Sequence, residues 1–196
     1  MYYYLFFCTN IILNKVIIMF DCLETERLII RKFMEGDLKE ILDYTSDPEV
    51  MRYLPENTFT KEDAEEFINK NIYKKPEELA VILKDENKLV GHIIFHTWYE
   101  PFKTWEIGWV FNREYHRKGL ASEAAAKVLK YGFETLNLHR VIATCDPRNT
   151  SSYKVMEKIG MRREGRNIKC VNINNEWLDE YFYAILDEEW LNKKRL

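Results

Sequence analysis

One short basic turn contains the residue types that most clearly indicate a functional site, and the function they indicate is anion binding. Its residues are His116, Arg117, Lys118, Gly119, Leu120 and Ala121. An apolar run precedes the turn, and the apolar residues after it are spaced as one face of a helix. The first N–H groups of a helix have no partner within it, and the helix dipole favours a negative charge there. Because the glycine lets an anion approach the backbone, this strand, turn and helix predict an anion site.

Two common nucleotide-binding motifs do not fit this turn. No Lys-Ser or Lys-Thr follows the glycine, as a Walker motif requires, and the three-glycine dinucleotide fingerprint is missing. Many strand–turn–helix units carry a glycine and a lysine and bind nothing. The turn alone is therefore weak evidence for an anion site, and the residues around it must be considered as well.

The turn resembles the pyrophosphate-binding motif of the GNAT superfamily of acetyl-CoA-dependent N-acetyltransferases, which is Arg/Gln-x-x-Gly-x-Gly/Ala at a helix start. His116 stands where that family usually carries Gln or Arg. The wider text, Glu-Ile-Gly-Trp and then Tyr-His-Arg-Lys-Gly-Leu-Ala-Ser-Glu-Ala, resembles the branch that acetylates ribosomal-protein N-termini. A second GNAT motif, Asn-x-x-Ser/Ala-x-x-Leu-x-x-x-x-Gly-Phe, is similar to the run from Asn149 to Met161, which includes Ser152 and Lys158.

The resemblance covers roughly residues 23–190 and implies the GNAT fold. This fold is of the α/β (α+β) class, with a mixed, strongly bent central sheet flanked by helices. The middle strands, near 106–111 and 141–145, are expected to splay apart and to pair with the pantetheine arm of acetyl-CoA near Val110 and Phe111. The resemblance also implies that Asn149, Ser152 and Lys158 face the cofactor. Acetyl-CoA is thus the expected co-substrate, no metal is expected, and transfer is direct within a ternary complex.

Acetyl transfer to an amine needs a neutral amine, donors for the tetrahedral oxyanion and a proton for the departing thiolate. Two carboxylates are candidates for the base. Glu106 lies in an apolar strand just before the basic turn, where it is functional, exposed to solvent or paired with Arg113. Glu164 matches a glutamate that the ribosomal-protein branch uses to deprotonate the amine. Alternatively, it is a surface charge beside Arg162 and Arg163.

Ser152 is the candidate for the acid, since the ribosomal-protein branch carries a serine at this position. Many superfamily members use a tyrosine where this chain has Met156, so that role does not transfer. Asn149 and Ser152 share one side of a helix, and Asn149 is also a plain N-cap. Cys145 lies on an expected splayed strand, but no His–Cys pattern supports a nucleophile.

Composition predicts a single folded domain over residues 21–196. The chain has 196 residues, of which 46% are hydrophobic and 31% charged, with a net charge of −3. This charge argues against a nucleic-acid partner. Four cysteines without a close pair indicate reduced thiols and a cytoplasmic protein. His92 and His96 share one strand face without a third ligand nearby, which favours ordinary sheet positions over a metal site.

Residues 1–20 differ from the rest because they contain no acid and only one base, Lys15. They lack the basic start and the small-residue cleavage site of a signal peptide, and polar residues interrupt them as a membrane span. We interpret them as an over-extended start ahead of Met19. An extra strand or helix is the second interpretation, and a membrane anchor is the third.

Periodicity and turn residues predict the remaining elements. Helices are expected at 37–44, from 47, at 60–72, 118–136 and 150–159. Strands are expected at 27–33, 78–84, 88–98, 103–111, 139–145, 161–169 and 181–186, with a turn at 172–175. An aromatic-rich hairpin is expected to lie mostly in the core, and it contains Trp98, Tyr99, Trp105 and Trp109.

Three functions stay open at this point. The resemblance favours acetylation of a protein N-terminal amine. An enzyme of the same fold that acetylates a small amine, such as a polyamine, amino sugar or aminoglycoside, is the alternative. A module that binds acetyl-CoA without catalysis is the third. A homodimer is common in the branch, and nothing in the sequence predicts a membrane partner.

Overall fold

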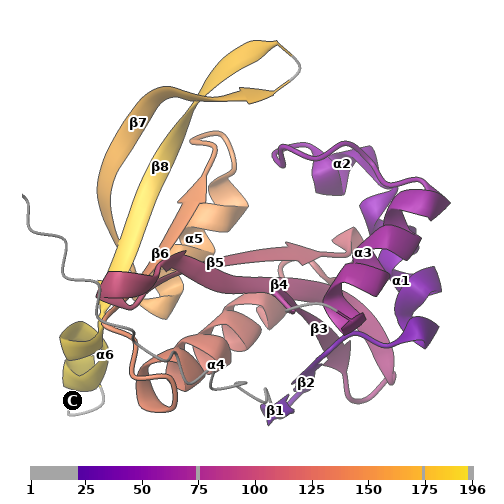
Figure 1. Ribbon diagram of the computed structural model, residues 1–196, viewed down its shortest axis with the longest axis horizontal. Helices are drawn as coiled ribbons and strands as arrows, with labels where there is room; N and C mark the ends of the chain where they lie inside the picture. Colours follow the sequence, from indigo (N-terminus) through magenta and orange to yellow (C-terminus); the bar gives the residue numbers. More distant parts are fainter. Residues whose placement is uncertain (1–21, 74–75, 174, 194–196) are drawn as a thin grey trace, which may run out of the picture.

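The computed structural model describes residues 22–73, 76–173 and 175–193, and the interpretation of residues 1–20 lies outside this range. It is an eight-stranded sheet with helices on both faces, in the order β1-β2-β3-β4-β5-β6-β8-β7 (Figure 1). The strands are β1 (Leu23–Glu24), β2 (Leu28–Arg31), β3 (Glu78–Leu83), β4 (Lys88–Tyr99), β5 (Thr104–Phe111), β6 (Arg140–Cys145), β7 (Arg162–Ile173) and β8 (Glu176–Leu186). The helices are α1 (Leu38–Thr45), α2 (Pro48–Met51), α3 (Lys61–Tyr73), α4 (Leu120–Glu134), α5 (Thr150–Ile159) and α6 (Asp187–Lys193).

The sheet opens between its two middle strands. β5 and β6 are the one parallel pair among the described strands, and their register covers only Thr104–Glu106 against Arg140–Ile142. Beyond these residues the two strands diverge, although β5 stays paired with β4 as far as Phe111 and β6 stays paired with β8 as far as Cys145. The mixed sheet with splayed middle strands, expected from the sequence, is confirmed.

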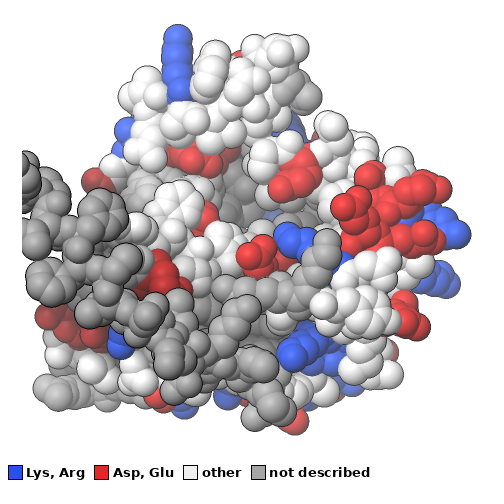
Figure 2. All heavy atoms as spheres, viewed as in Figure 1, with Lys and Arg blue, Asp and Glu red and all other residues white. Residues whose placement is uncertain are grey.

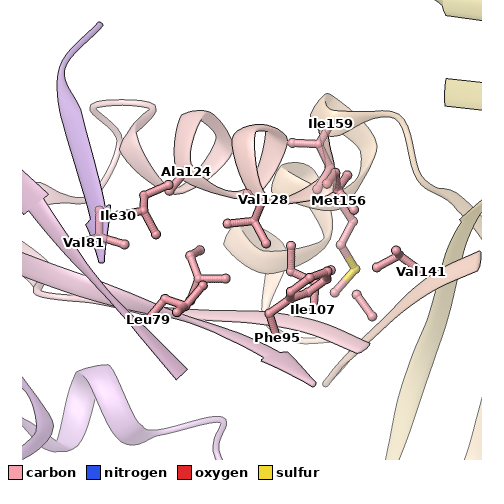
Figure 3. Close-up of a cluster of buried hydrophobic side chains, with 14 of the residues drawn as sticks. Ile30, Leu79, Val81, Phe95, Ile107, Ala124, Val128, Val141, Met156 and Ile159 are labelled. Atoms are coloured by element: carbon pink, nitrogen blue, oxygen red, sulfur yellow. The ribbon is translucent and has the colours of Figure 1, made fainter. Parts of the chain in front are cut away.

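Each face of the sheet has its own core. On one face, α4 and α5 cover apolar strand residues such as Ile107 and Val141, and Met156 of α5 packs among them (Figure 3). On the other face, α1 and α3 pack on β3, β4 and the end of β5, where Val110 is buried. Side chains alternate along a strand. Glu106 and Gly108 therefore lie on the same face as Val110, opposite α4 and α5.

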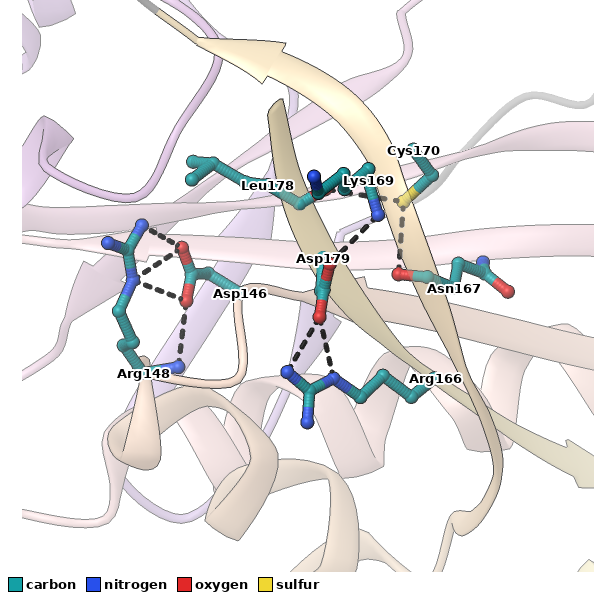
Figure 4. A network of polar contacts seen from close by, with 8 residues as sticks. All are labelled: Asp146, Arg148, Arg166, Asn167, Lys169, Cys170, Leu178 and Asp179. Carbon is teal, nitrogen blue, oxygen red and sulfur yellow. Dashed lines mark hydrogen bonds and ion pairs between the residues drawn. The ribbon is translucent and has the colours of Figure 1, made fainter. Parts of the chain in front are cut away.

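The last two strands are longer than the sequence predicts. They form a hairpin that rises from the domain and bends over it (Figure 1), and their pairing runs through the expected turn to Ile173 and Glu176. Nearly all of β7 is exposed, so no apolar alternation marks it as a strand. A register shift between Asn167 and Val171 leaves extra residues in β7. Asp179 anchors this bulge by accepting bonds from Arg166 and from the Lys169 N–H (Figure 4).

The other elements follow the predicted pattern, with three differences. The short strand β1 (Leu23–Glu24), which pairs with β2, was not predicted. α4 begins at Leu120 rather than at residue 118, because Arg117 (φ 61°) and Gly119 (φ 79°) adopt left-handed backbone. The sequence did not predict α6, which follows directly on β8. Within the described ranges, no helix is long and apolar enough to cross a bilayer.

Candidate active site

The N-terminus of α4 is built to receive an anion. Gly119 is the N-cap residue and its φ of 79° turns the chain into the helix without a capping side chain. The amides of the first turn, including those of Leu120 and Ala121, therefore lack the side-chain partner that Ser, Thr or Asp provides elsewhere. Free amides at the positive end of a 15-residue helix fit a phosphate group.

Two cations from distant parts of the chain lie at the same turn. The Arg27 guanidinium and the Lys158 amine are each 3.7 Å from the point where Gly119 would carry a Cβ. Arg27 also donates to the Lys118 carbonyl oxygen, and it pairs with Glu123 in the first turns of α4. The structure thus brings Lys158, from the second motif, to the turn of the first. Arg27 is a site residue that the sequence did not indicate.

The side chains of His116 and Lys118 are used within the turn. His116 Nε2 lies 2.9 Å from the Phe111 carbonyl oxygen, so this nitrogen carries the hydrogen and ties the turn to the end of β5. The Lys118 amine lies over the Tyr115 ring, 4.7 Å from its centroid. Both residues therefore contribute to the anion site through the backbone conformation that they stabilise.

The backbone of β5 presents polar groups to the gap beside β6. The Asn112 N–H donates to the Val90 carbonyl oxygen at 2.9 Å, so Asn112 and every second residue before it, including Val110, bond toward β4. Trp109 consequently directs its N–H and C=O groups toward the gap, and Phe111 directs its N–H there, while the Phe111 carbonyl oxygen accepts the bond from His116. The backbone groups available to a ligand therefore belong to Trp109 rather than to Val110, whereas Phe111 faces the gap as expected.

The second motif caps α5 and reaches the end of β6. Asn149 accepts a bond from the Ser152 N–H at 3.1 Å, so its N-cap role is confirmed. The Ser152 side chain lies near the thiol of Cys145, the last residue of β6, and interacts with it. Burial raises the pKa of this thiol to about 11, and the interaction with Ser152 offsets only part of that rise. Near neutral pH the Cys145 thiol therefore stays protonated, and a protonated thiol is a poor nucleophile.

Glu106 lies where β5 and β6 separate, and its carboxylate faces the sheet surface opposite α4 and α5. Its side chain is 21% exposed, and its Oε2 lies 3.7 Å from His96 Nε2 on β4. Burial raises the pKa of the Glu106 carboxyl, His96 lowers it, and the negative charge of Glu180 on β8 raises it further. The alternative pairing with Arg113 is wrong, because Arg113 pairs with Asp47.

Glu164 has a different environment. Its carboxylate accepts hydrogen bonds from the guanidinium groups of Arg140 and Arg162. The bond from Arg140 is the main reason that the pKa of Glu164 lies below its ordinary value. A carboxylate held by two guanidinium groups is a weak proton acceptor. The geometry therefore favours Glu106 over Glu164 as a base.

The two histidines singled out in the sequence have separate surroundings. His92 is buried, with Nδ1 2.7 Å from the Tyr44 hydroxyl and Nε2 3.4 Å from Glu78. Burial lowers the pKa of His92 to about 3 and raises that of Glu78 to about 7. Among the described residues, no group of three His, Cys, Asp or Glu side chains could hold a metal ion.

The aromatic hairpin divides between the core and the surface. Trp105 and Trp109 pack against the core, whereas Trp98 and Tyr99 are exposed, which corrects the expectation that the group is mostly core. In the space-filling view, acidic side chains border the hollow below the β7–β8 hairpin and gather on the α3 side of the molecule (Figure 2).

Comparison with known proteins agrees with this geometry. The family of acetyltransferase (GNAT) domains matches residues 27–162. The chain belongs to the GNAT acetyltransferase family. It is therefore an acetyl-CoA-dependent N-acetyltransferase.

Several relatives cover most of this GNAT chain. It is 56% identical to the uncharacterized N-acetyltransferase YnaD of Bacillus subtilis, over 85% of this chain and 97% of that protein. A crystal structure of a GNAT-family acetyltransferase from Bacillus anthracis is also 56% identical, with a TM-score of 0.82, over 86% of this chain and 99% of that one.

More distant relatives differ in the acceptor that their names give. A putative ribosomal N-acetyltransferase, YdaF of Bacillus subtilis, is 31% identical over 56% of this chain and 60% of that protein. A spermidine N(1)-acetyltransferase of Vibrio cholerae is 25% identical over 85% of this chain and 97% of that protein.

The site fits the acetyl-CoA that GNAT enzymes use. The uncapped start of α4, with Arg27 and Lys158 beside it, suits the pyrophosphate, and the open edge of β5 suits the amides of the pantetheine arm. Sequence reasoning missed Arg27, Trp109 and Glu180. Their roles depend on strand register and on contacts between distant segments, and no local pattern indicates either.

Proposed function

We propose that this GNAT enzyme acetylates the N-terminal amine of a protein or peptide, by direct attack within a ternary complex. Acetyl-CoA supplies the acetyl group as a thioester. The proposal depends above all on one observation, the half-buried Glu106 carboxylate at the point where β5 and β6 separate, with His96 beside it.

Glu106 would act as the general base. A protein α-amine has an ordinary pKa of about 7.7–8.0 and is partly neutral at pH 7, so it needs only a modest base. Burial raises the pKa of Glu106 toward the range in which a carboxylate accepts a proton more readily. The amine N–H bond breaks as its proton moves to a Glu106 oxygen, and the nitrogen attacks the thioester carbonyl. The C–S bond of the tetrahedral intermediate then breaks and releases the thiolate of coenzyme A.

Ser152 would protonate the departing thiolate. Its position in the first turn of α5, next to the end of β6, supports this role. The neutral Cys145 thiol supports transfer without an acyl-enzyme. Asn149 would hold the helix start that positions Ser152. Glu164 is the less favoured base because its charge is already engaged by Arg140.

The relative named a putative ribosomal N-acetyltransferase supports a protein acceptor. A second acceptor class, a polyamine, is supported by two further observations. Glu106 and Glu180 lie on one face of the sheet, where the charge of Glu180 acts on Glu106, and two carboxylates on one face attract a polycation. The relative from Vibrio cholerae is named a spermidine acetyltransferase.

A thiol-release assay with acetyl-CoA would separate these acceptors. The panel contains peptides that begin with Ala, Ser or Met, spermidine, an aminoglycoside, and a lysine peptide with a blocked N-terminus. Turnover on the free N-terminal peptides, with none on the blocked peptide, is the expected result. Turnover on spermidine alone would replace the first acceptor class by the second. Mass spectrometry of the product locates the acetyl group.

A further inference from the structure

Glu106 has one titratable neighbour on each side. The register places His96 directly opposite it on β4, with 3.7 Å between His96 Nε2 and Glu106 Oε2. On β6 the residue opposite Glu106 is Ile142, which carries no charge. On β8, Tyr181 and Tyr183 pack toward the α4–α5 core, so Glu180 lies on the Glu106 face. Its charge interacts with that of Glu106.

The hydrogen bond of His96 fixes which ring nitrogen faces Glu106. Nδ1 lies 3.2 Å from the Thr97 carbonyl oxygen, which can only accept, so Nδ1 carries a hydrogen. Nε2, which faces the Glu106 carboxylate, then either presents a lone pair to it or carries a second N–H. Two lone pairs facing each other repel. The contact of Nε2 with an ionised Glu106 is therefore attractive only when Nε2 carries a hydrogen.

The Glu180 carboxylate has its own anchor. Its Oε2 lies 3.7 Å from the Cys170 thiol, and Cys170 belongs to the bulge that Asp179 holds in β7 (Figure 4). Glu180 pairs in register with Asn167, just before that bulge. The β7–β8 hairpin therefore holds the Glu180 charge at a set place relative to β5.

We propose that His96 and Glu180 are positioning residues that act on Glu106 from opposite sides, His96 as the partner of its charged form and Glu180 as the like charge that opposes it. This inference rests on the proposed function of Glu106 as the base. Neither residue needs to touch the amine. His96 keeps the carboxylate ionised and oriented, and Glu180 makes it a stronger proton acceptor.

The pH dependence of kcat/KM tests both roles with one acceptor. His96 lowers the pKa of Glu106 and Glu180 raises it. The acidic limb of the profile should therefore move to higher pH in His96→Gln and to lower pH in Glu180→Gln. His139→Gln and Glu176→Gln are matched controls, since both residues are exposed and Glu176 lies on the same strand as Glu180. Their profiles should coincide with the wild type.

Shifts of the acidic limb in opposite directions in the two variants support the proposal. If the acidic limb does not shift in one variant, the role proposed for the residue replaced in that variant is refuted. A raised KM for a cationic acceptor with an unmoved limb would make Glu180 a binding residue only. Should His96→Gln fail to fold, His96→Asn offers the same test with a smaller side chain, and acetyl-CoA binding checks folding. Wild-type turnover after Glu106→Gln would refute the proposed base. An essential Glu106 with unmoved limbs would refute only the present inference.

Discussion

Replacing Lys158 by alanine should weaken acetyl-CoA binding about fivefold. The Lys158 amine lies 3.7 Å from the position of a Cβ on Gly119, so a phosphate on the α4 amides would lie about 5 Å away. Two unit charges at that separation interact by about 3 kcal/mol at an effective dielectric constant of about 20. Lys158 is exposed, which reduces the net contribution to about 1 kcal/mol, or about a fivefold change in Kd.

Calorimetric titration measures this effect, and the chain offers a matched control. Lys154 is an exposed lysine on the same helix, one turn earlier, and Lys154→Ala should leave the Kd unchanged. The loss in Lys158→Ala should shrink as salt rises, because screening weakens the attraction. Acetyl-pantetheine, which lacks the pyrophosphate, should bind Lys158→Ala and wild type equally. Equal losses with both ligands would refute a phosphate contact.

Four further outcomes follow from the described contacts. Glu106→Gln should lower kcat by about 10²- to 10⁴-fold in the thiol-release assay and leave the Kd for acetyl-CoA unchanged, because the base acts on the amine alone. Cys145→Ala should keep its turnover, since the thiol pKa of about 11 keeps Cys145 neutral, and an acetylated enzyme in mass spectra would contradict this. Glu164→Gln should change kcat by less than about twofold but lower Tm by about 2–4 °C, because Arg140 and Arg162 lose their shared partner. Gly119→Ala should lower both Tm and acetyl-CoA affinity, because a φ of 79° strains any residue with a Cβ by about 1 kcal/mol; unchanged values would show that the turn can relax.

The sequence predicted the parts of the site that depend on local signals. The turn at Gly119 could be predicted because a strand, a glycine and a helical apolar face follow one another within one segment. Asn149 could be predicted because capping acts over three residues. The contact between Arg27 and Glu123 joins segments 96 residues apart, and no local pattern reports it. The neighbours of Glu106 depend on strand register, which is why its alternative pairing was wrong.

The β7–β8 hairpin shows a second limit. Apolar alternation marks a strand only where one face is buried, and β7 is exposed along most of its length. Its strand structure comes from pairing with β8 and from the bonds of Asp179 to Arg166 and Lys169. The length of this hairpin therefore follows from tertiary contacts that the sequence pattern does not carry.

The opening between β5 and β6 should also make the stability of the protein depend on the concentration of its ligand. Only three residue pairs join these strands, so the backbone of β5 beyond Glu106 has an open edge inside the fold. A ligand that fills this edge binds the native chain and not the unfolded one. At a concentration 100 times its Kd, such a ligand adds about 2.7 kcal/mol to the free energy of unfolding. The lifetime of the enzyme should thus rise and fall with the acetyl-CoA supply, independently of how much acceptor is present.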